Sequence, residues 1–285
     1  MGTRIKFFSD PHSDINQWRL DDLFNGCDEN YDIALIAGDI AGDQEDIEYF
    51  LNTYFPNKRV FFVTGNHDLV YSHDNYLRRL TLNTTKQKLR NVYGPHNELH
   101  RVLDNEYVKL SDGLYVIGST FYTDYALFGR GEIRERQMYL GEQFLNDFRF
   151  GHVESEKGGT RLLRARDYLK FHKESKRKIK AIHDKIVAED RNAKIILITH
   201  HCLSDKCISP EFQTSRGNAS FVSNLEKWVV EKLPNVAVVH SGHVHHCDVF
   251  EFGPDNHKVK YILNPVGYLQ YGEGDNYNKN LIMEL

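Results

Sequence analysis

Residues able to bind metal ions and transfer protons occur in five short clusters, each at the end of an apolar run. In chain order the clusters are Ser9-Asp10-Pro11-His12, Gly38-Asp39, Gly65-Asn66-His67-Asp68, Thr199-His200-His201 and Gly242-His243-Val244-His245. Histidine is unusually frequent, with 15 residues in the chain. Aspartate, histidine and asparagine donors, with no thiolate required, suit divalent Mn, Fe, Ni or Zn. The clusters therefore predict a metal site.

The spacing within the first and last clusters favours shared binding of an ion. Residues i and i+2 of an extended segment point the same way, so Asp10 and His12 are expected to reach one ion together. The same geometry is expected for His243 and His245. The candidate ligands are Asp10, His12, Asp39, Asn66, His200, His243 and His245. This set is too large for one ion with an open coordination position and about right for two, with Asp39 as a candidate bridge between ions roughly 3.5–4 Å apart.

The elements that position these clusters are predicted from short runs rich in Val, Ile and Phe, which are typical of buried strands. The predicted strands are Ile5–Ser9, Ile33–Ala37, Val60–Thr64, Tyr115–Ser119, Ile195–Thr199, Val236–Ser241 and Tyr261–Leu263. Helices are predicted over Gln44–Tyr54, about Arg164–Asp190, and Phe221–Leu233. Strands that alternate with helices indicate an α/β layered fold. Two predicted hairpins, Glu106–Leu110 with Leu114–Gly118 and Asp248–Phe252 with Tyr261–Leu263, indicate mixed sheets.

Ligands of open α/β sheets bind outside the carboxyl ends of the strands, so the five clusters are expected to converge. Their ordered set of Asp-x-His, Gly-Asp, Gly-Asn-His-Asp, a strand-end His and Gly-His-x-His resembles the calcineurin-like metallophosphoesterase superfamily. The resemblance implies a four-layer αββα sandwich, in which two mixed β-sheets are flanked by helices, with the site at one edge. It also implies the metal ligands: Asp10, His12, Asp39 and His245 for one ion, and Asp39, Asn66, His200 and His243 for the other.

The same resemblance implies a mechanism. Two divalent ions (Mn, Fe, Ni or Zn, with Mn favoured in vitro) would hold the phosphate and lower the pKa of a bridging water. The resulting hydroxide would attack phosphorus in line with the leaving group. His67 matches the catalytic histidine of the superfamily, and it would stabilise the transferring phosphoryl group or protonate the departing alkoxide.

Finer similarity points to a bacterial and phage subgroup of small phosphoesterases. The segments that carry it are 118–125, 146–148, Thr199-His200-His201 and 264–268. The sequence departs from that subgroup at Tyr122, Cys202-Leu203, Val244 and Val266. None of these residues is a predicted metal ligand, so the departures concern contacts to the substrate.

Several neighbours of the predicted ligands have alternative roles. Asp43 or Asp68 is expected to orient His67 through a hydrogen bond, the alternative being an ordinary turn or cap role. His201 points away from His200 in a strand exit, so we expect it to pack or to support a ligand, and His246 is treated likewise.

Cysteine and turn residues near the clusters are also candidates. Cys202 and Cys247 are expected to be buried thiols and not ligands, because the ligand pattern is complete without them. Asn264 and Tyr268 are candidates to line the pocket, the alternative being a turn after the last core strand. The four cysteines form no C-x-x-C pair, which indicates reduced thiols and a cytoplasmic location.

The region from about 123 to 190 is polar, helical and charged. Lys157–Lys185 contains 11 Lys or Arg and three Asp or Glu, a local net charge of 11 − 3 = +8. It is either a solvated helix face or an electropositive cap that attracts an anionic substrate. We predict a single domain over residues 1–285, with a helical, basic cap or insertion at about 123–190.

The amino-acid composition limits which other classes of protein the chain could belong to. Hydrophobic residues make up 40% and aromatic residues 12% of the 285 residues, enough for a sizeable core. No apolar run approaches 18 residues, so no membrane span or membrane partner is expected. The formal net charge of −4 argues against a surface that is basic throughout.

These observations predict a dinuclear metal-dependent phosphoesterase that hydrolyses a phosphomonoester or phosphodiester, with a small or medium molecule favoured as substrate. The alternatives within enzymes are a nuclease or a protein phosphatase that uses the same site. Lys157–Lys185 favours nucleic acid, whereas the acidic chain and the lack of interleaved aromatic and basic residues argue against it. A non-catalytic scaffold would be expected to lose ligands or His67, and all are present.

Overall fold

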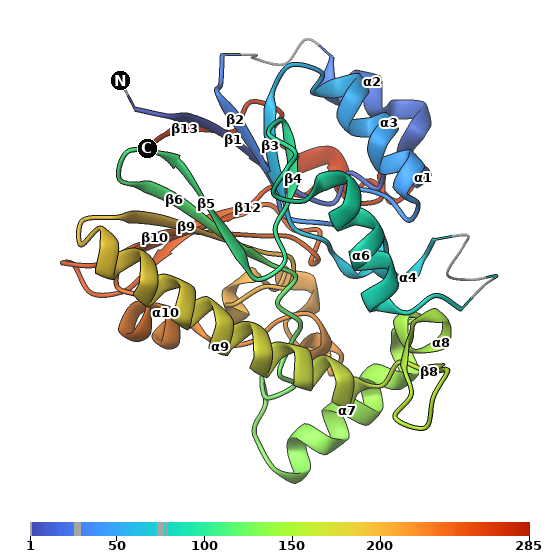
Figure 1. Ribbon diagram of the computed structural model, residues 1–285. Coiled ribbons are helices and arrows are strands. Elements are labelled where there is room, and N and C mark those ends of the chain that lie inside the picture. Colours follow the sequence, from blue (N-terminus) through green and yellow to red (C-terminus); the bar gives the residue numbers. More distant parts are fainter. Residues whose placement is uncertain (1, 26–29, 73–76, 78) are drawn as a thin grey trace.

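The computed structural model describes residues 2–25, 30–72, 77 and 79–285. Two β-sheets lie face to face, and helices cover their outer faces (Figure 1). The first sheet has the strand order β13–β1–β2–β3–β4, with β1 Arg4–Phe8, β2 Ile33–Ile36, β3 Arg59–Phe62, β4 His100–Val102 and β13 Ile282–Glu284. Strands β1 to β4 pair in parallel, and β13 is antiparallel to β1.

The second sheet has the order β11–β12–β10–β9–β6–β5. Its strands are β5 Glu106–Ser111, β6 Leu114–Ser119, β9 Lys194–Thr199, β10 Val236–Ser241, β11 Asp248–Phe252 and β12 Val259–Leu263. The inner pairs β12–β10, β10–β9 and β9–β6 are parallel, whereas β5 and β11 join the edges as antiparallel hairpin partners. Both predicted hairpins are therefore present, and the sheet is mixed.

The core between the sheets explains why the strands are apolar on both faces. Ile5 and Phe7 of β1 point inward and pack with Val116 of β6 and Ile198 of β9. Phe8 points to the other side of the first sheet, where it contacts the helical layer. Strands buried on both faces read as continuous apolar runs, which is the signal that identified them in the sequence.

Helices form the outer layers. The outer face of the first sheet packs against α2 Leu20–Phe24, α3 Gln44–Tyr54 and α6 Leu82–Tyr93. The outer face of the second sheet packs against α9 Ala165–Glu189 and α10 Glu226–Lys232. The predicted α/β class and the αββα layering are confirmed.

One predicted helix boundary is wrong. Residues 221–225 were predicted as the first turn of a helix, but α10 begins at Glu226. Residues Asn218–Ser220 form a 3-10 helix instead, and Val222 makes a β-bridge to Cys202. Tertiary pairing with the segment after β9 therefore overrides the helical pattern at these positions.

The region 123–190 is more varied than its sequence indicates. It contains α7 Glu132–Phe144, α8 Asp147–Phe150, a hairpin of β7 His152–Glu154 and β8 Thr160–Leu162, and α9. The hairpin was not predicted. Ile179 and Ile186 of α9 lie in the core over the second sheet, so the C-terminal half of this helix is a layer of the sandwich. None of the described helices is both long enough and apolar enough to cross a bilayer.

Candidate metal centre

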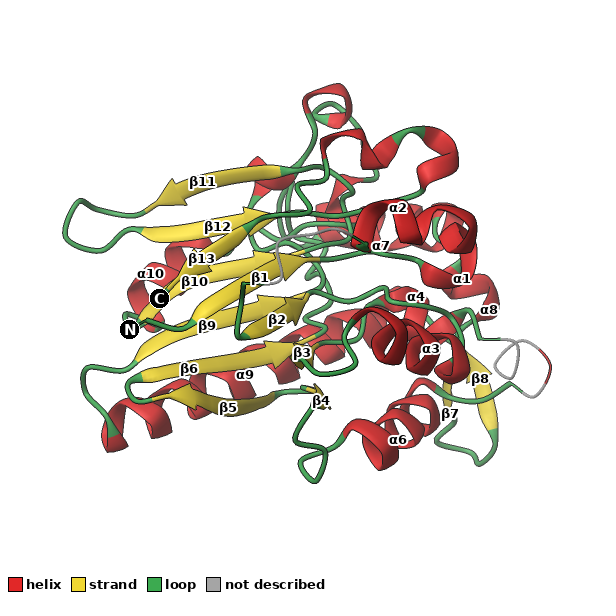
Figure 2. Ribbon diagram, turned by 90° about the horizontal axis from the view of Figure 1, so that it is seen from above, coloured by secondary structure: helices red, strands yellow, loops and turns green. Residues whose placement is uncertain are grey.

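Parallel strands in both sheets run to the same edge of the molecule, where the connecting loops gather (Figure 2). Strands β1, β2 and β3 of the first sheet and β9 and β10 of the second are each followed by one of the five polar clusters. The short helices α1 Ser13–Asn16 and α4 Asn66–Val70 begin at this edge. All seven predicted ligands and His67 therefore lie in one region.

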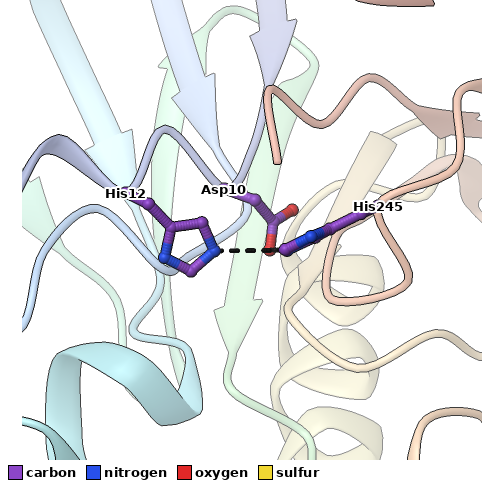
Figure 3. Close-up of side chains that lie close together, drawn as sticks. All are labelled: Asp10, His12 and His245. Atoms are coloured by element: carbon purple, nitrogen blue, oxygen red, sulfur yellow. Dashed lines mark hydrogen bonds and ion pairs between the residues drawn. The ribbon is translucent and has the colours of Figure 1, made fainter. Parts of the chain in front are cut away.

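Asp10, His12 and His245 form the first group of side chains, and they point toward one another (Figure 3). The Nε2 atom of His245 lies 3.2 Å from Nε2 of His12 and 3.4 Å from Oδ1 of Asp10. Asp10 and His12 are fully buried. The Asp10 carboxylate also accepts the backbone N–H of His243 at 3.0 Å, which ties the loop after β1 to the loop after β10.

Asp39, Asn66, His200 and His243 form the second group, centred on the Nε2 atom of His200. This atom lies 3.0 Å from Oδ1 of Asn66, 3.2 Å from Nδ1 of His243 and 3.4 Å from Oδ2 of Asp39. The four side chains are buried. They come from different strand ends, which the sheet order brings together.

Asp39 lies between the two groups. Its Oδ2 atom is 3.4 Å from Nε2 of His200 in the second group and 3.9 Å from Nε2 of His12 in the first. Its Oδ1 atom accepts the backbone N–H of His67 at 2.8 Å. One carboxylate therefore faces both groups, which is the position a bridging ligand requires.

The backbone at these residues differs from the sequence-based expectation. Asp10, His12, His243 and His245 were expected in extended segments, but all adopt the left-handed region. Five candidate ligands have positive φ values, namely 52° at Asp10, 41° at His12, 53° at Asp39, 71° at His243 and 46° at His245. Such conformations cost of order 1–3 kcal/mol each and persist only where the surroundings fix them. Sharp left-handed turns, and not an extended i/i+2 geometry, aim Asp10, His12 and His245 at the first group and His243 at the second. The expectation that His243 and His245 share one ion is therefore wrong.

Hydrogen bonds on the far side of three ligands orient them. His200 Nδ1 donates to the carbonyl oxygen of Ala37 at 2.8 Å, which leaves Nε2 directed at the second group. Glu273 Oε2 lies 2.6 Å from Nδ1 of His245. The amide nitrogen of Asn66 donates to Asp147 at 3.2 Å, so the amide oxygen faces His200. Partners of this kind fix the ring and amide orientation of metal ligands.

The donor set fits divalent cations. Carboxylate oxygens and imidazole nitrogens crowd within 4.8 Å of one another in each group of titratable donors. Burial lowers the pKa of His200, but the charge of Asp39 outweighs it and raises the pKa to about 9. Burial also lowers the pKa of His245, and the hydrogen bonds to Asp10 and Glu273 raise it to about 10. The site therefore attracts positive charge, which a bound metal ion would supply.

His67 lies beside the two groups and is oriented by Asp14. Its Nε2 atom lies 2.8 Å from Oδ2 of Asp14, and its ring stacks on Tyr71 at 5.0 Å between centroids. Burial lowers the pKa of His67, but the hydrogen bond and the charge of Asp14 outweigh it, so the pKa is raised overall. The prediction that Asp43 or Asp68 orients His67 is wrong, because the carboxylate that contacts the ring belongs to α1.

Asp68 holds the backbone of the site instead. Its carboxylate accepts the backbone N–H groups of Asp39, Ile40, Ala41 and Gly65 at 2.7–3.0 Å. Gly65 is required there, because an added Cβ would lie 1.9 Å from Oδ1 of Asp39. This buried carboxylate therefore ties the loop after β2 to the loop after β3.

The remaining candidates have packing roles of different kinds. His201 is fully buried with its ring 4.2 Å from that of His243, as expected of a neighbour that supports a ligand. Cys202 is a buried free thiol, whereas Cys247 is only partly buried. Tyr268 stacks on His12 at 4.4 Å and lines the pocket. Asn264 instead donates to the backbone of Phe7 and Asn278, which is a structural role.

Two further positions complete the outcome for the predicted residues, and three functional residues were not predicted. His246 is partly buried and joins none of the donor groups among the described residues. Cys27 lies outside the described residues. Asp14, Glu273 and Asp147 were missed by the sequence analysis. For Asp14 the sequence offered a signal, because it lies four residues after Asp10 and just beyond the first cluster. Glu273 and Asp147 have no comparable motif beside them in the sequence.

A cavity of about 560 Å³ opens from the two groups. Its floor is formed by Asp39, Asn66, His243 and His245. Its wall is formed by residues 144–147, at the end of α7 and the start of α8, and by the segment 208–221. The candidate metal centre is therefore accessible to a molecule from one side.

Comparison with known proteins identifies the class. The model of the calcineurin-like phosphoesterase family matches residues 3–247, and the chain belongs to this family. The protein is thus a metallophosphoesterase, a metal-dependent hydrolase of phosphoester bonds. No match was found among curated proteins.

Solved structures agree on the fold. The crystal structure of phosphopantetheinyl hydrolase (PptH) from Mycobacterium tuberculosis superimposes with a TM-score of 0.72 at 14% sequence identity, covering 100% of this chain and 96% of the other. The protein TT1561 of Thermus thermophilus aligns with a TM-score of 0.49 at 11% identity, covering 93% and 90% of the two chains. The first similarity supports the same overall fold, and the second is too weak to add to it.

Proposed function

We propose that the protein is a dinuclear phosphoesterase that hydrolyses a small or medium phosphomonoester or phosphodiester. The observation that carries the proposal is the position of Asp39, whose Oδ2 atom faces His12 at 3.9 Å and His200 at 3.4 Å. One ion would be held by Asp10, His12, Asp39 and His245, and the other by Asp39, Asn66, His200 and His243. When bound, the ions would supply Lewis-acid activation of water and neutralise charge on the phosphate.

The residues of the chain have separate tasks in this proposal. His67 would donate a hydrogen bond or a proton to the phosphoryl group or the leaving oxygen, and Asp14 holds its ring at 2.8 Å. Because Nε2 of His67 is engaged by Asp14, Nδ1 is the ring nitrogen that would have to serve the substrate. Tyr71 and Tyr268 pack on His67 and His12 and keep water away from one side of the site.

The cavity favours a small molecule over the alternatives. None of its lining residues comes from Lys157–Lys185, the stretch that favoured nucleic acid. A non-catalytic scaffold is not supported, because every predicted ligand and His67 is present and oriented. The similar mycobacterial structure is that of a phosphopantetheinyl hydrolase, so a phosphopantetheinyl ester belongs in the substrate panel.

The test is hydrolysis of a phosphomonoester and a phosphodiester that share one chromogenic leaving group. Metal-stripped protein is assayed alone and after addition of Mn, Ni, Zn or Mg, and bound metal is counted by elemental analysis. We expect two ions per chain, turnover restored by metal, and loss of about 10²–10⁴-fold in His67→Ala with both ions retained. One ion per chain at full activity, or unchanged turnover in His67→Ala, would contradict the proposal.

A further inference from the structure

The wall of the cavity has a chemistry different from that of its floor. Beyond the candidate ligands and their partners, apolar and small polar residues alternate along it, and the apolar side chains are Phe144, Leu145, Ile208, Phe212, Phe221 and Val244. Two of the rings are exposed at the mouth, with 62% of Phe144 and 55% of Phe212 accessible. Phe221 stacks on His243 with centroids 4.9 Å apart, so the apolar wall reaches the metal centre itself.

Its size suits an organic molecule. A volume of about 560 Å³ lies within the roughly 300–1,000 Å³ that is typical of sites for drug-sized ligands. Exposed rings also occur elsewhere on the molecule, as at Trp18, but Phe144 and Phe212 lie beside the cavity that leads to the metal centre. They offer flat apolar faces to whatever is attached to the phosphate.

The wall is also nearly free of positive charge. Among the described residues that line the cavity, Arg216 is the only Lys or Arg. Its side chain is exposed and forms no ion pair with a carboxylate in the part of the chain that the structure describes. A nucleic acid requires many cations to neutralise its phosphates, whereas one arginine matches one additional anionic group.

Close packing fixes the two parts of the wall relative to each other. An added Cβ at Gly141 of α7 would lie 2.7 Å from Oγ of Ser220, so α7 and the 3-10 helix Asn218–Ser220 are in direct contact. Within the second segment, the amide of Asn218 donates to the carbonyl oxygen of Phe212 at 2.7 Å. The aromatic rim is therefore carried by a packed unit.

We propose that the wall selects phosphoesters whose organic group is a flat, largely apolar body bearing one anionic group, with the rings of Phe144 and Phe212 against the body and Arg216 against the anion. This inference rests on the proposed function, since it requires the phosphate to sit at the metal centre. It names Phe144, Phe212 and Arg216 as specificity-determining residues, from a region whose sequence carried no such signal.

The experiment compares four aryl phosphates whose phenol leaving groups have similar acidity: phenyl, 2-naphthyl, 6-carboxamido-2-naphthyl and 6-carboxy-2-naphthyl phosphate. The metal-loaded full chain is used throughout. We expect kcat/KM to rise about tenfold from phenyl to naphthyl, because a second ring is buried against the wall. We expect a further preference of about two- to fivefold for the carboxylate over the carboxamide, the size of an exposed ion pair, and this preference should fall as salt is added.

Two variants with matched controls assign the effects. Arg216→Gln should reduce the carboxylate-to-carboxamide ratio to about one, whereas Arg177→Gln, which removes the same charge from α9, should not change it. Phe212→Ala should lower the naphthyl-to-phenyl ratio at least about threefold, whereas Trp18→Ala, which removes another exposed ring outside the cavity, should leave it unchanged. Melting temperatures of all four variants check that each is folded.

The outcomes separate this inference from the proposed function. If phenyl phosphate is hydrolysed with metal but the ratios equal one, or do not respond to Arg216→Gln and Phe212→Ala, the selectivity proposal is wrong and the phosphoesterase proposal stands. If neither these monoesters nor the chromogenic phosphodiester is hydrolysed with any metal, the proposed function itself fails and the wall has no phosphoester to select.

Discussion

The floor and the wall of the cavity are built in opposite ways. The floor, together with the ligands beneath it, consists of largely buried side chains at the ends of five strands, and several of them are held by backbone or by a second carboxylate, as Asp10 is by the N–H of His243. The wall consists of α7, α8 and the 3-10 turns of segment 208–221, and it presents exposed rings such as Phe144 and Phe212. Buried, hydrogen-bonded side chains therefore lie where the chemistry requires a fixed geometry, whereas the wall presents exposed side chains that would contact a substrate through shape and polarity.

The largest effect is expected from Asp39→Asn, at the centre of the floor. The substitution keeps the volume and an oxygen for the N–H of His67, but it removes the charge that faces both groups. We expect loss of one bound ion and a fall in kcat of at least about 10³-fold, larger than that for loss of one hydrogen-bond donor in an active site. Elemental analysis and turnover on the same sample check both parts. Two tightly bound ions in an active Asp39→Asn protein would show that the floor needs no bridging charge.

A smaller effect is expected from Asp14→Asn, which acts on His67 and not on the ions. Asparagine at this position offers a weaker acceptor to Nε2 of His67 and no negative charge. We expect kcat to fall about 10- to 10²-fold with metal content unchanged.

A double-mutant cycle provides the control for that change. Because Asp14 is proposed to work through His67, Asp14→Asn should cost little in a His67→Ala background. Equal losses in the two backgrounds would show that Asp14 acts elsewhere, for instance by holding the N–H of Gly42 at 3.2 Å.

Regions whose structure depends on residues nearby in the chain were predictable from the sequence, whereas regions that depend on contacts between distant residues were not. Buried parallel strands carry a local apolar signal and end directly in the candidate ligands, so the α/β class and the convergence at one edge were predictable from the residues. The four-layer arrangement was implied only by the family resemblance. Short edge strands such as β4 and β13 have three residues each, too few to give a pattern. The left-handed backbone at His12 and His245 was not predicted, because nothing in the residue types distinguishes such a turn from an extended exit.

The partners of the ligands were missed for a related reason. Glu273 is 28 residues from His245 and Asp147 is 81 residues from Asn66, and only the folded chain brings them together. The wall is similar, since α7 and the segment 208–221 meet through packing at Gly141. Its apolar lining could not be inferred from a stretch that reads as polar and charged.

Asp147 belongs to the wall of the cavity, but its carboxylate contacts Asn66 of the floor. Its buried carboxylate accepts from Asn66, from Tyr71 at 2.8 Å and from Tyr168 at 2.7 Å. We expect Asp147→Asn to weaken the binding of one of the two ions about 10- to 100-fold, because the Asn66 amide loses its fixed orientation. Competition with a chelator should show that one ion is bound more weakly and that the affinity for the other is unchanged. Tyr168→Phe, which removes only a tyrosine partner, should have a smaller effect, and equal weakening of both ions would contradict a role through Asn66.

The smallest effect is expected from the basic face of α9, which belongs to neither region. Lys170, Lys173 and Arg177 are exposed and do not line the cavity. At physiological ionic strength the Debye length is about 8 Å, so distant exposed charges are largely screened from the metal centre. We expect the triple change to glutamine to leave kcat/KM for phenyl phosphate within about twofold of the native value.

The same triple variant decides between the two interpretations of the basic stretch. If this face bound single-stranded nucleic acid, removal of three phosphate contacts would lower the slope of log K against log salt by about 2. We expect instead no salt-dependent binding to lose, since the described lining of the cavity contains one arginine and no lysine. A polyanion that crosses α9 would therefore meet a single described cation along the wall toward the metal centre. A measured loss of slope, together with a fall in hydrolysis of an oligonucleotide, would move the function from small phosphoesters to nucleic acid and make α9 the substrate-selecting surface in place of the wall.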